Sequence, residues 1–254
     1  MHPILFRIGG LTVHTYGLFV AIGFLMGMAL AVRESRRLGI DPEKTANLFF
    51  WIVISAIAGS RLLYIIVEFR SFVSAPLETV KIWKGGLVFY GGLILAVIVA
   101  VFYIRRNGMP LWRTMDILVP SLAIGQVFGR TGCFFAGCCY GRPANGRFAV
   151  TFTNPDSLAP LYIPLHPVQL YEAAAVFVIF LVLWTVRRAK RFEGRLVWIY
   201  LTLYSGARFL IENYRGDPRG RVLGNVFSTG QFISLVLILA GVLGYIYSQR
   251  RRPE

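Results

Sequence analysis

An arginine in a glycine-rich apolar segment is the first residue of this chain whose setting indicates chemistry. Arg130 lies in GQVFGRTGCFFAGCCYG, which holds no other charged residue. A guanidinium in apolar surroundings is costly without a partner, and it binds phosphate or carboxylate through two parallel hydrogen bonds. Two interpretations therefore stand side by side: a binding site for an anionic group, or a buried pair that only stabilises the fold.

A second charged set lies in YSGARFLIENYRGDPRG. Its members are Tyr204, Arg208, Glu212 and Arg215. Their separations of four, four and three residues place them on one face of a helix. Such a stripe can hold an anion while its internal ion pairs orient the arginines. The alternative is a solvated, salt-bridged face at the end of a helix.

The sequence HPVQLYEA carries a third polar set. Pro167 suits the first turn of a helix, and His166, Gln169 and Glu172 follow one another at spacings of three. His166 is predicted as a general base or as a donor that orients a ligand, with a structural role at the helix start as the alternative. Glu172 is expected to pair with an arginine.

Two tyrosines beside glycines complete the polar candidates. Tyr16 opens the first apolar segment, and Tyr90 lies between Gly85, Gly86 and Gly91, Gly92 in GGLVFYGG. Either phenol can hydrogen-bond a substrate, or it can anchor a helix at the membrane interface.

The three cysteines give a weak metal signal. Cys133, Cys138 and Cys139 follow the spacing C-x4-CC, without the paired C-x2-C motifs of zinc sites. We therefore expect no metal and no cofactor, and we interpret these residues as small apolar packing groups. A thiol-based membrane redox protein is kept as an alternative.

Composition indicates the kind of element that must position these residues. Hydrophobic residues make up 56% of the 254 residues and charged residues 15%, whereas soluble domains carry about a quarter charged residues. This profile excludes a disordered chain, a collagen-like chain and an ordinary soluble enzyme. The net charge of +15 is attributed to the cytoplasmic ends of membrane helices rather than to nucleic-acid binding.

We expect an all-α integral membrane protein, a single domain over residues 1–254 with seven transmembrane helices. A bilayer core of about 30 Å needs roughly 20 apolar residues per helix. The expected helices are about 15–33, 45–67, 86–104, 115–131, 168–187, 196–213 and 228–248. The basic clusters RESRR, RRN, RRAKR and RRR follow alternate helices, which predicts an outer N-terminus and a cytoplasmic C-terminus. The proline-rich residues 142–167 are expected to form an ordered periplasmic loop or cap.

Five motifs together resemble the prolipoprotein diacylglyceryl transferase family of bacterial inner membranes. They are HTYGL at 14–18, GGLVFYGGL at 85–93, GRTGCFFAGCCYG at 129–141, HPVQLYEA at 166–173 and GARFLIENYRGD at 206–217. The resemblance covers nearly the whole chain, and the glycine-rich arginine segment is its most specific part.

The resemblance implies that a diacylglyceryl group passes from phosphatidylglycerol to the lipobox cysteine of a preprolipoprotein signal peptide. The product is a thioether, and glycerol phosphate leaves. It also implies that Arg130 contacts the phospholipid and that Arg208 is essential. The remaining residues that match family positions are Tyr16, Gly141, Glu212 and Arg215. The predicted catalytic set is therefore Arg130, Arg208, Glu212, His166 and Tyr90, and the predicted lipid-binding set is Arg130, Tyr16, Gly141, Arg215 and Tyr204.

The chain departs from part of the family at three positions. Tyr90 stands where some members have a histidine proposed as the base, and a phenol loses its proton only well above neutral pH. The base is then His166 or Glu212, or else the arginines alone activate the thiol. Cys133 and Cys138 stand where some members have asparagine and an acidic residue. A membrane transporter of anions or lipids remains the main alternative function, although no internal repeat is visible.

Overall fold

The computed structural model describes residues 1–9, 11–69, 73, 88–189, 193–216, 220–222 and 226–250. Gly85 and Gly86 of the tyrosine motif, and the start of the helix expected from residue 86, lie outside these residues. The long helices are α1 (Thr15–Arg37), α2 (Pro42–Val67), α5 (Phe89–Arg106), α6 (Leu111–Ala136), α7 (Val168–Val186), α8 (Arg195–Glu212) and α9 (Thr229–Arg250). The strands are β1 (Ile4–Ile8), β2 (Leu11–His14), β3 (Val150–Thr151), β4 (Pro164–Leu165), β5 (Arg221–Val222) and β6 (Phe227–Ser228).

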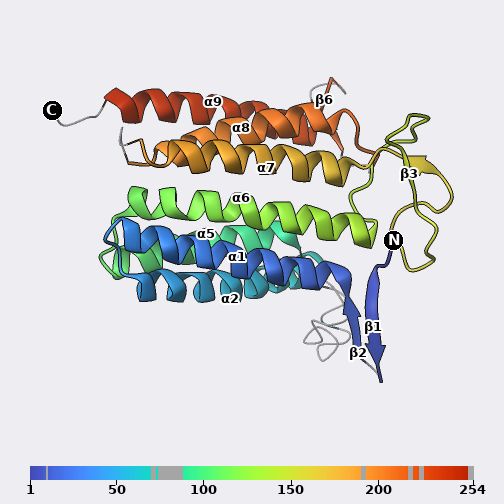
Figure 1. Ribbon diagram of the computed structural model, residues 1–254, viewed down its shortest axis with the longest axis horizontal. Coiled ribbons are helices and arrows are strands. Elements are labelled where there is room, and N and C mark those ends of the chain that lie inside the picture. Colours follow the sequence, from blue (N-terminus) through green and yellow to red (C-terminus); the bar gives the residue numbers. More distant parts are fainter. Residues whose placement is uncertain are drawn as a thin grey trace. The chain divides into compact units, whose positions relative to one another are not determined.

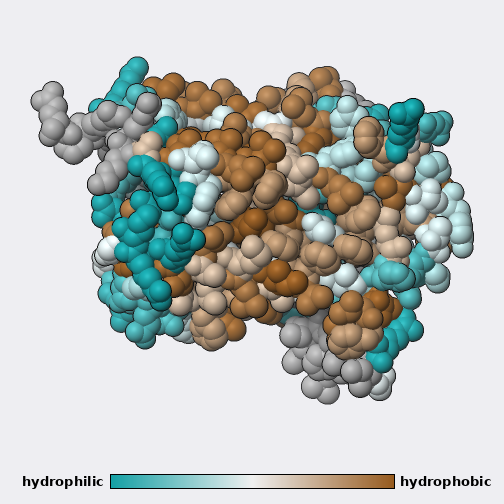
Figure 2. Space-filling view, viewed as in Figure 1, coloured by the Kyte–Doolittle hydropathy of each residue, from teal (hydrophilic) through white to brown (hydrophobic). Residues whose placement is uncertain are grey.

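Most of the long helices have the length and composition of membrane spans. Of the seven described helices named above, six are long and apolar enough to cross a bilayer, and α8 is the exception. Arg195, Arg208 and Glu212 make α8 more polar than its neighbours. Figure 2 shows hydrophobic residues along the helices and hydrophilic residues toward their ends. The chain is thus a largely helical, multi-pass membrane protein, and the count of seven spans stays a prediction.

Contacts divide the chain into two compact units, Met1–Leu30 with Met115–Glu254, and Ala31–Thr114. The single domain expected from the sequence stays a prediction. In the first unit, α6, α7 and α8 share an apolar core (Figure 1). Its buried members are Val119, Ala123, Val176, Ile179, Leu183, Leu196 and Tyr200. Helix α9 packs closely on α8, where the indole of Trp198 donates a hydrogen bond to Ser248 Oγ at 3.0 Å.

Glycines bring α1 and α6 together within the first unit. A Cβ added to Gly23 would lie 2.9 Å from Phe128 Cβ, and one added to Gly27 would lie 2.9 Å from the Ser121 carbonyl oxygen. Small residues four apart allow this close approach of helix backbones, as they do in many membrane helix pairs. The contact fixes the start of α1 against the segment that carries Arg130.

The backbone around Arg130 differs from the expectation. The predicted helix over 115–131 ends near that arginine, but α6 continues to Ala136. Gly132 stays helical because it packs against Tyr16 and Phe19, where a Cβ would lie 3.1 Å from Phe19 Cβ. The turn comes at Gly137, whose φ of +77° favours glycine. Arg130 therefore projects from regular helix.

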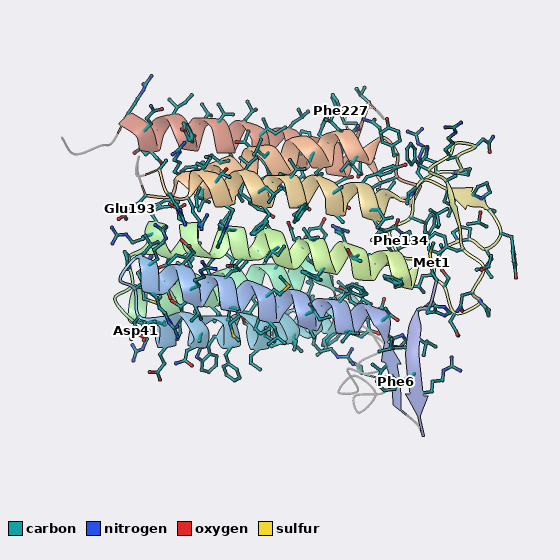
Figure 3. The ribbon with its side chains drawn as sticks, viewed as in Figure 1. Met1, Phe6, Asp41, Phe134, Glu193 and Phe227 are labelled. Atoms are coloured by element: carbon teal, nitrogen blue, oxygen red, sulfur yellow. The ribbon has the colours of Figure 1, made fainter. Side chains whose placement is uncertain are left out.

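Short antiparallel pairs add to the helices, and the all-α prediction missed them. Strands β1 and β2 form a hairpin before α1, β3 pairs with β4, and β5 pairs with β6. Residues 142–167 contain a small core of Phe152, Ala159 and Leu165, and their role as a periplasmic loop or cap stays a prediction. Met1 and Phe134 both pack against that core (Figure 3).

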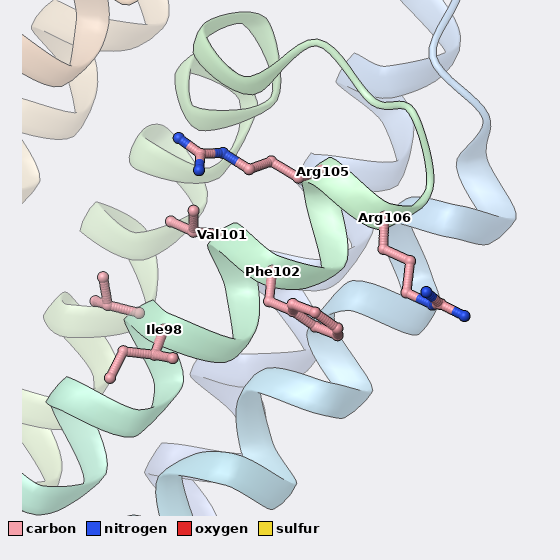
Figure 4. Close-up of a pocket in the computed structure, with 6 residues that line it drawn as sticks. Ile98, Val101, Phe102, Arg105 and Arg106 are labelled. Carbon is pink, nitrogen blue, oxygen red and sulfur yellow. The ribbon is translucent and has the colours of Figure 1, made fainter.

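In the second unit, α2 and α5 form a tight pair. A Cβ added to Gly91 would collide with the Gly59 carbonyl oxygen, so the two backbones are in close contact. Lys44 donates to the Asn107 carbonyl at 3.1 Å. A pocket on α5 lies beside the basic end of this helix (Figure 4). It is lined by Val97, Ile98, Val101, Phe102, Arg105 and Arg106.

Candidate functional site

A buried carboxylate on α7 forms the centre of the candidate site. Glu172 lies in the second turn of α7 and is 1% exposed, and Gln169, one turn earlier, is fully buried. Pro167 precedes the first turn, so α7 begins where the sequence predicts. An ionised carboxylate in such a place requires cationic or hydrogen-bonding partners.

Three arginines from two parts of the sequence surround Glu172. Arg130 Nη2 lies 3.1 Å from Glu172 Oε1, and Arg208 Nε lies 3.9 Å from the same oxygen. Arg215 Nη1 lies 3.5 Å from Oε2. The expected pairing of Glu172 with an arginine is therefore present, but the carboxylate serves three arginines rather than one.

Glu212 is the second acidic member of the cluster. Its Oε2 lies 2.5 Å from Arg208 Nη2 and 3.9 Å from Arg215 Nε. The Ser228 hydroxyl donates to Oε1 at 3.0 Å. Helix α8 ends at Glu212, so Arg215 reaches the cluster from the turn after the helix and not from the helical face predicted for it.

The charges of this five-residue cluster do not cancel. Three guanidinium groups and two carboxylates leave a net charge of +1, and both carboxylates are at most 5% exposed. Among the described residues, Arg208 Nη1 is a buried nitrogen without a hydrogen-bond partner. The arrangement can therefore take an additional anionic group, and Arg130, whose side chain is 26% exposed, is its most accessible arginine.

A short backbone ladder holds the cluster together. The Gly141 N–H donates to the His166 carbonyl at 3.1 Å, and the Gly216 N–H donates to the Tyr140 carbonyl at 3.1 Å. A Cβ added to Gly141 would lie 2.6 Å from His166 Cβ. Residue 141 is thus a glycine because two neighbouring segments contact its backbone, and its predicted role in lipid binding stays a prediction.

His166 lies among aromatic side chains beside this ladder. Its Nδ1 is 3.2 Å from the Tyr171 hydroxyl, and its ring meets the ring of Tyr214 edge to face at 5.3 Å between centroids. These contacts fix the orientation of the imidazole. They are consistent with a positioned base and equally with a structural role, so the assignment of His166 stays a prediction.

The predicted tyrosines have different surroundings. Tyr16 lies at the start of α1 and packs against Gly132. Gly132 is less than one helical turn from Arg130 on α6. Tyr204 stacks on Tyr200 with 5.5 Å between ring centroids. Tyr90 belongs to the other unit and is 59% exposed, so the structure does not assign it to this cluster.

The three cysteines come closer together than their spacing indicates. Their sulfur atoms all lie within 4.8 Å of one another, and none of the three forms a disulfide. The Gln169 amide donates to the Cys138 carbonyl at 2.7 Å, which ties this segment to α7 one turn from Glu172. The spacing alone gave no sign of this convergence.

Sequence reasoning also missed two supporting residues. Ser228, which contacts Glu212, lies outside the quoted motifs. Gln126, which accepts a hydrogen bond from Tyr200 at 2.7 Å, lies in the glycine-rich arginine segment but was given no role there. The one available signal for Gln126 was its place in an apolar helix, where a polar side chain needs a partner. No comparable signal marked Ser228, since serine is common near helix starts.

Comparison with known proteins identifies the family of the chain. The family model described as prolipoprotein diacylglyceryl transferase matches residues 3–247. A phosphatidylglycerol–prolipoprotein diacylglyceryl transferase of Clostridium tetani is 37% identical over 253 residues, covering 99% of this chain and 100% of the relative. The proteins of the same name from Synechococcus elongatus and Bacillus licheniformis are 36% identical over 260 residues and 34% identical over 258 residues. These alignments cover 98% and 100% of this chain, and 89% and 95% of the two relatives. The chain belongs to the prolipoprotein diacylglyceryl transferase family.

Proposed function

We propose that this chain is the transferase that moves the diacylglyceryl group of phosphatidylglycerol to the lipobox cysteine of a preprolipoprotein signal peptide. The sulfur forms a thioether and glycerol phosphate is released, which is the first step of lipoprotein maturation. Family membership and the names of the relatives support this assignment over transport or redox chemistry. The single structural observation that carries it is the buried arginine cluster with a net charge of +1.

The charge of the cluster fits the charge change of the reaction. A phosphodiester carries one negative charge, and the phosphate monoester that leaves carries more. Donors that bind the leaving phosphate more tightly as this charge develops lower the barrier. Arg130, Arg208 and Arg215 are the proposed donors, since each already contacts a carboxylate that keeps it in place.

The remaining predicted residues have supporting roles in this proposal. Tyr16, Gly141 and Tyr204 line or shape the lipid site beside the arginines. The attacking thiol has an ordinary pKa of about 8.5, so it must lose its proton at the site. His166 and Glu212 are the proposed bases because they lie in the same unit as Arg130, whereas a phenol such as that of Tyr90 is a poor base, since phenols have an ordinary pKa of about 10.

We also propose the membrane arrangement. The family resemblance implies the bacterial inner membrane, and alternate basic clusters favour seven spans with the N-terminus outside. Arg36 and Arg37 end α1, Arg105 and Arg106 end α5, and Arg250 ends α9, all in the last helical turn. Reporter fusions after α1 and after α2 are expected to report opposite sides of the membrane, and equal signals would contradict this topology.

A transfer assay tests the function directly. Purified protein in detergent receives phosphatidylglycerol and a lipobox peptide, and mass spectrometry follows both the peptide and the released glycerol phosphate. The wild type is expected to add one diacylglyceryl group per peptide. Arg130→Ala is expected to reduce the rate on the order of 100-fold or more, because one charge-stabilising donor is lost.

Two controls sharpen this assay. A peptide with serine in place of the lipobox cysteine should gain no mass, since the nucleophile is absent. Arg130→Lys keeps the charge but loses the two-pronged geometry, so an intermediate rate is expected. A well-folded wild type that transfers nothing would overturn the proposed function.

A further inference from the structure

The three cysteines form a compact thiol site in the first unit. The chain has three cysteines in total, and their sulfurs lie within 4.8 Å of one another. Cys133 is 8% exposed, while Cys138 and Cys139 are partly buried. Three sulfurs bound to one tetrahedral zinc at about 2.3 Å would be roughly 3.8 Å apart. The observed cluster therefore needs only a small contraction to hold a metal.

An unusual backbone conformation produces this convergence. Neighbouring side chains on an extended segment point in opposite directions, so Cys138 and Cys139 would normally diverge. Cys139 instead has a φ of +60°, which non-glycine residues seldom adopt and which costs energy. This turn lets both thiols face Cys133, which lies at the end of α6.

Contacts on both sides hold the turn in place. The carbonyl of Cys138 accepts the Gln169 amide at 2.7 Å, and the carbonyl of Tyr140 accepts the Gly216 N–H at 3.1 Å. Cys133 also follows Arg130 by three residues on the same helix, so the two share one face. The thiol site thus adjoins the arginine cluster.

We propose that Cys133, Cys138 and Cys139 bind one zinc ion and leave its fourth coordination position for the thiol of the substrate. Borderline-soft zinc suits thiolate ligands, and three protein ligands with one open position are typical of catalytic zinc.

The chemical step rests on the proposed transferase function and balances as follows. The lipobox S–H releases its proton to solvent as the zinc–sulfur bond forms. The zinc-bound sulfur then gives an electron pair to the glycerol carbon, whose bond to the phosphate oxygen breaks. The electron pair of the broken carbon–oxygen bond leaves on the phosphate oxygen of glycerol phosphate, and the step needs no oxidant or reductant. A coordinated thiol is deprotonated at neutral pH and remains a nucleophile.

Metal binding is tested without reference to activity. The purified chain is reduced, stripped with a chelator, and titrated with Zn²⁺ and with Co²⁺. We expect one metal per chain, a tetrahedral Co²⁺ spectrum with thiolate charge-transfer absorption, and three thiols that zinc protects from alkylation. Because the chain has no other cysteine, such a spectrum can arise only from this site.

Variants separate the site from general effects on folding. Cys133→Ser should weaken zinc binding by roughly 100-fold or more, because it removes a metal ligand. Loss of a residue that only hydrogen-bonds a ligand costs less. Thr131→Ala, on the same helix with its hydroxyl bonded to the Val127 carbonyl at 2.9 Å, should bind zinc like the wild type. Octahedral Co²⁺ with equal alkylation of all thiols at any zinc concentration would overturn the proposal.

The open position is tested with the peptide alone. A lipobox peptide added to the Co²⁺-loaded chain should strengthen the charge-transfer absorption, and its serine analogue should not. An unchanged spectrum would overturn thiol coordination even if the metal binds. The transfer assay on the zinc-loaded wild type is run in parallel, so failure of this inference is distinguishable from failure of the proposed function.

Discussion

Glu172 and Asp116 are two carboxylates of the same unit, and each has three positively charged or positively polarised partners. The partners of Glu172 are the side chains of Arg130, Arg208 and Arg215. Those of Asp116, on α6, are the backbone N–H groups of Gly194, Leu196 and Val197, at 2.8, 2.9 and 3.3 Å. One carboxylate is thus held by cationic side chains and the other by backbone N–H groups at the start of α8.

The difference between these donors separates structure from function. Gly194 is the N-cap of α8 and has no side chain with which to cap it, so Asp116 supplies the acceptor from α6. Asp116 already occupies those backbone donors, so they are not available to a ligand. The guanidinium groups around Glu172 have further N–H groups and a surplus charge, so they can bind a substrate phosphate while keeping their carboxylate.

The largest expected effect comes from removing a donor of the Glu172 cluster. Arg208→Ala should reduce transfer on the order of 100- to 1,000-fold, because it removes a charge that the departing phosphate needs. The rate is measured with the lipobox peptide, and detergent thermal unfolding serves as the control. If Arg208→Ala transfers at the wild-type rate, Arg208 does not bind the departing phosphate.

Neutralising the shared carboxylate is expected to affect both activity and stability. Glu172→Gln keeps the shape but leaves three arginines with one carboxylate, so breaking this buried pairing should cost about 3 kcal/mol. We expect a lower unfolding temperature together with a loss of transfer of about 10-fold or more from misaligned arginines. Unaltered unfolding would show that the arginines do not depend on Glu172 for their positions.

Asp116→Ala tests the structural half of the comparison. Removing the acceptor leaves three N–H groups of α8 unpaired and should cost about 1–3 kcal/mol of stability. Transfer per folded molecule should stay within about twofold, since the backbone donors do not touch substrate. Asp116→Asn, which keeps one acceptor oxygen, should lose less stability, and a selective loss of activity in either variant would contradict the distinction.

The smallest effect is expected at Ser228. Its hydroxyl supports Glu212 with one hydrogen bond at 3.0 Å, which is worth about 1 kcal/mol. Ser228→Ala should therefore cost about 1 kcal/mol of stability and slow transfer by at most roughly fivefold. A loss as large as that of Arg208→Ala would mean that Ser228 contacts the substrate itself.

The long helices could be predicted because each is a local feature of the chain. An apolar stretch long enough to span a bilayer must satisfy its own backbone, which favours a helix whatever surrounds it. The end of α6 was misplaced because the helicity of Gly132 depends on its contact with Tyr16 and Phe19. The two-residue strand pairs were missed because such short elements have no periodic pattern.

The sequence by itself determined the membrane class, the apolar helices, the family and the presence of Arg130 and Arg208. Only the tertiary structure decided that Glu172 is the partner these arginines share and that three unevenly spaced cysteines meet. The physical reason is the distance along the sequence over which each interaction acts. Hydrophobicity and helix formation act between near neighbours in sequence, whereas ion pairs and thiol contacts depend on how helices pack. Residues 42 positions apart, as Arg130 and Glu172 are, become partners only through that packing.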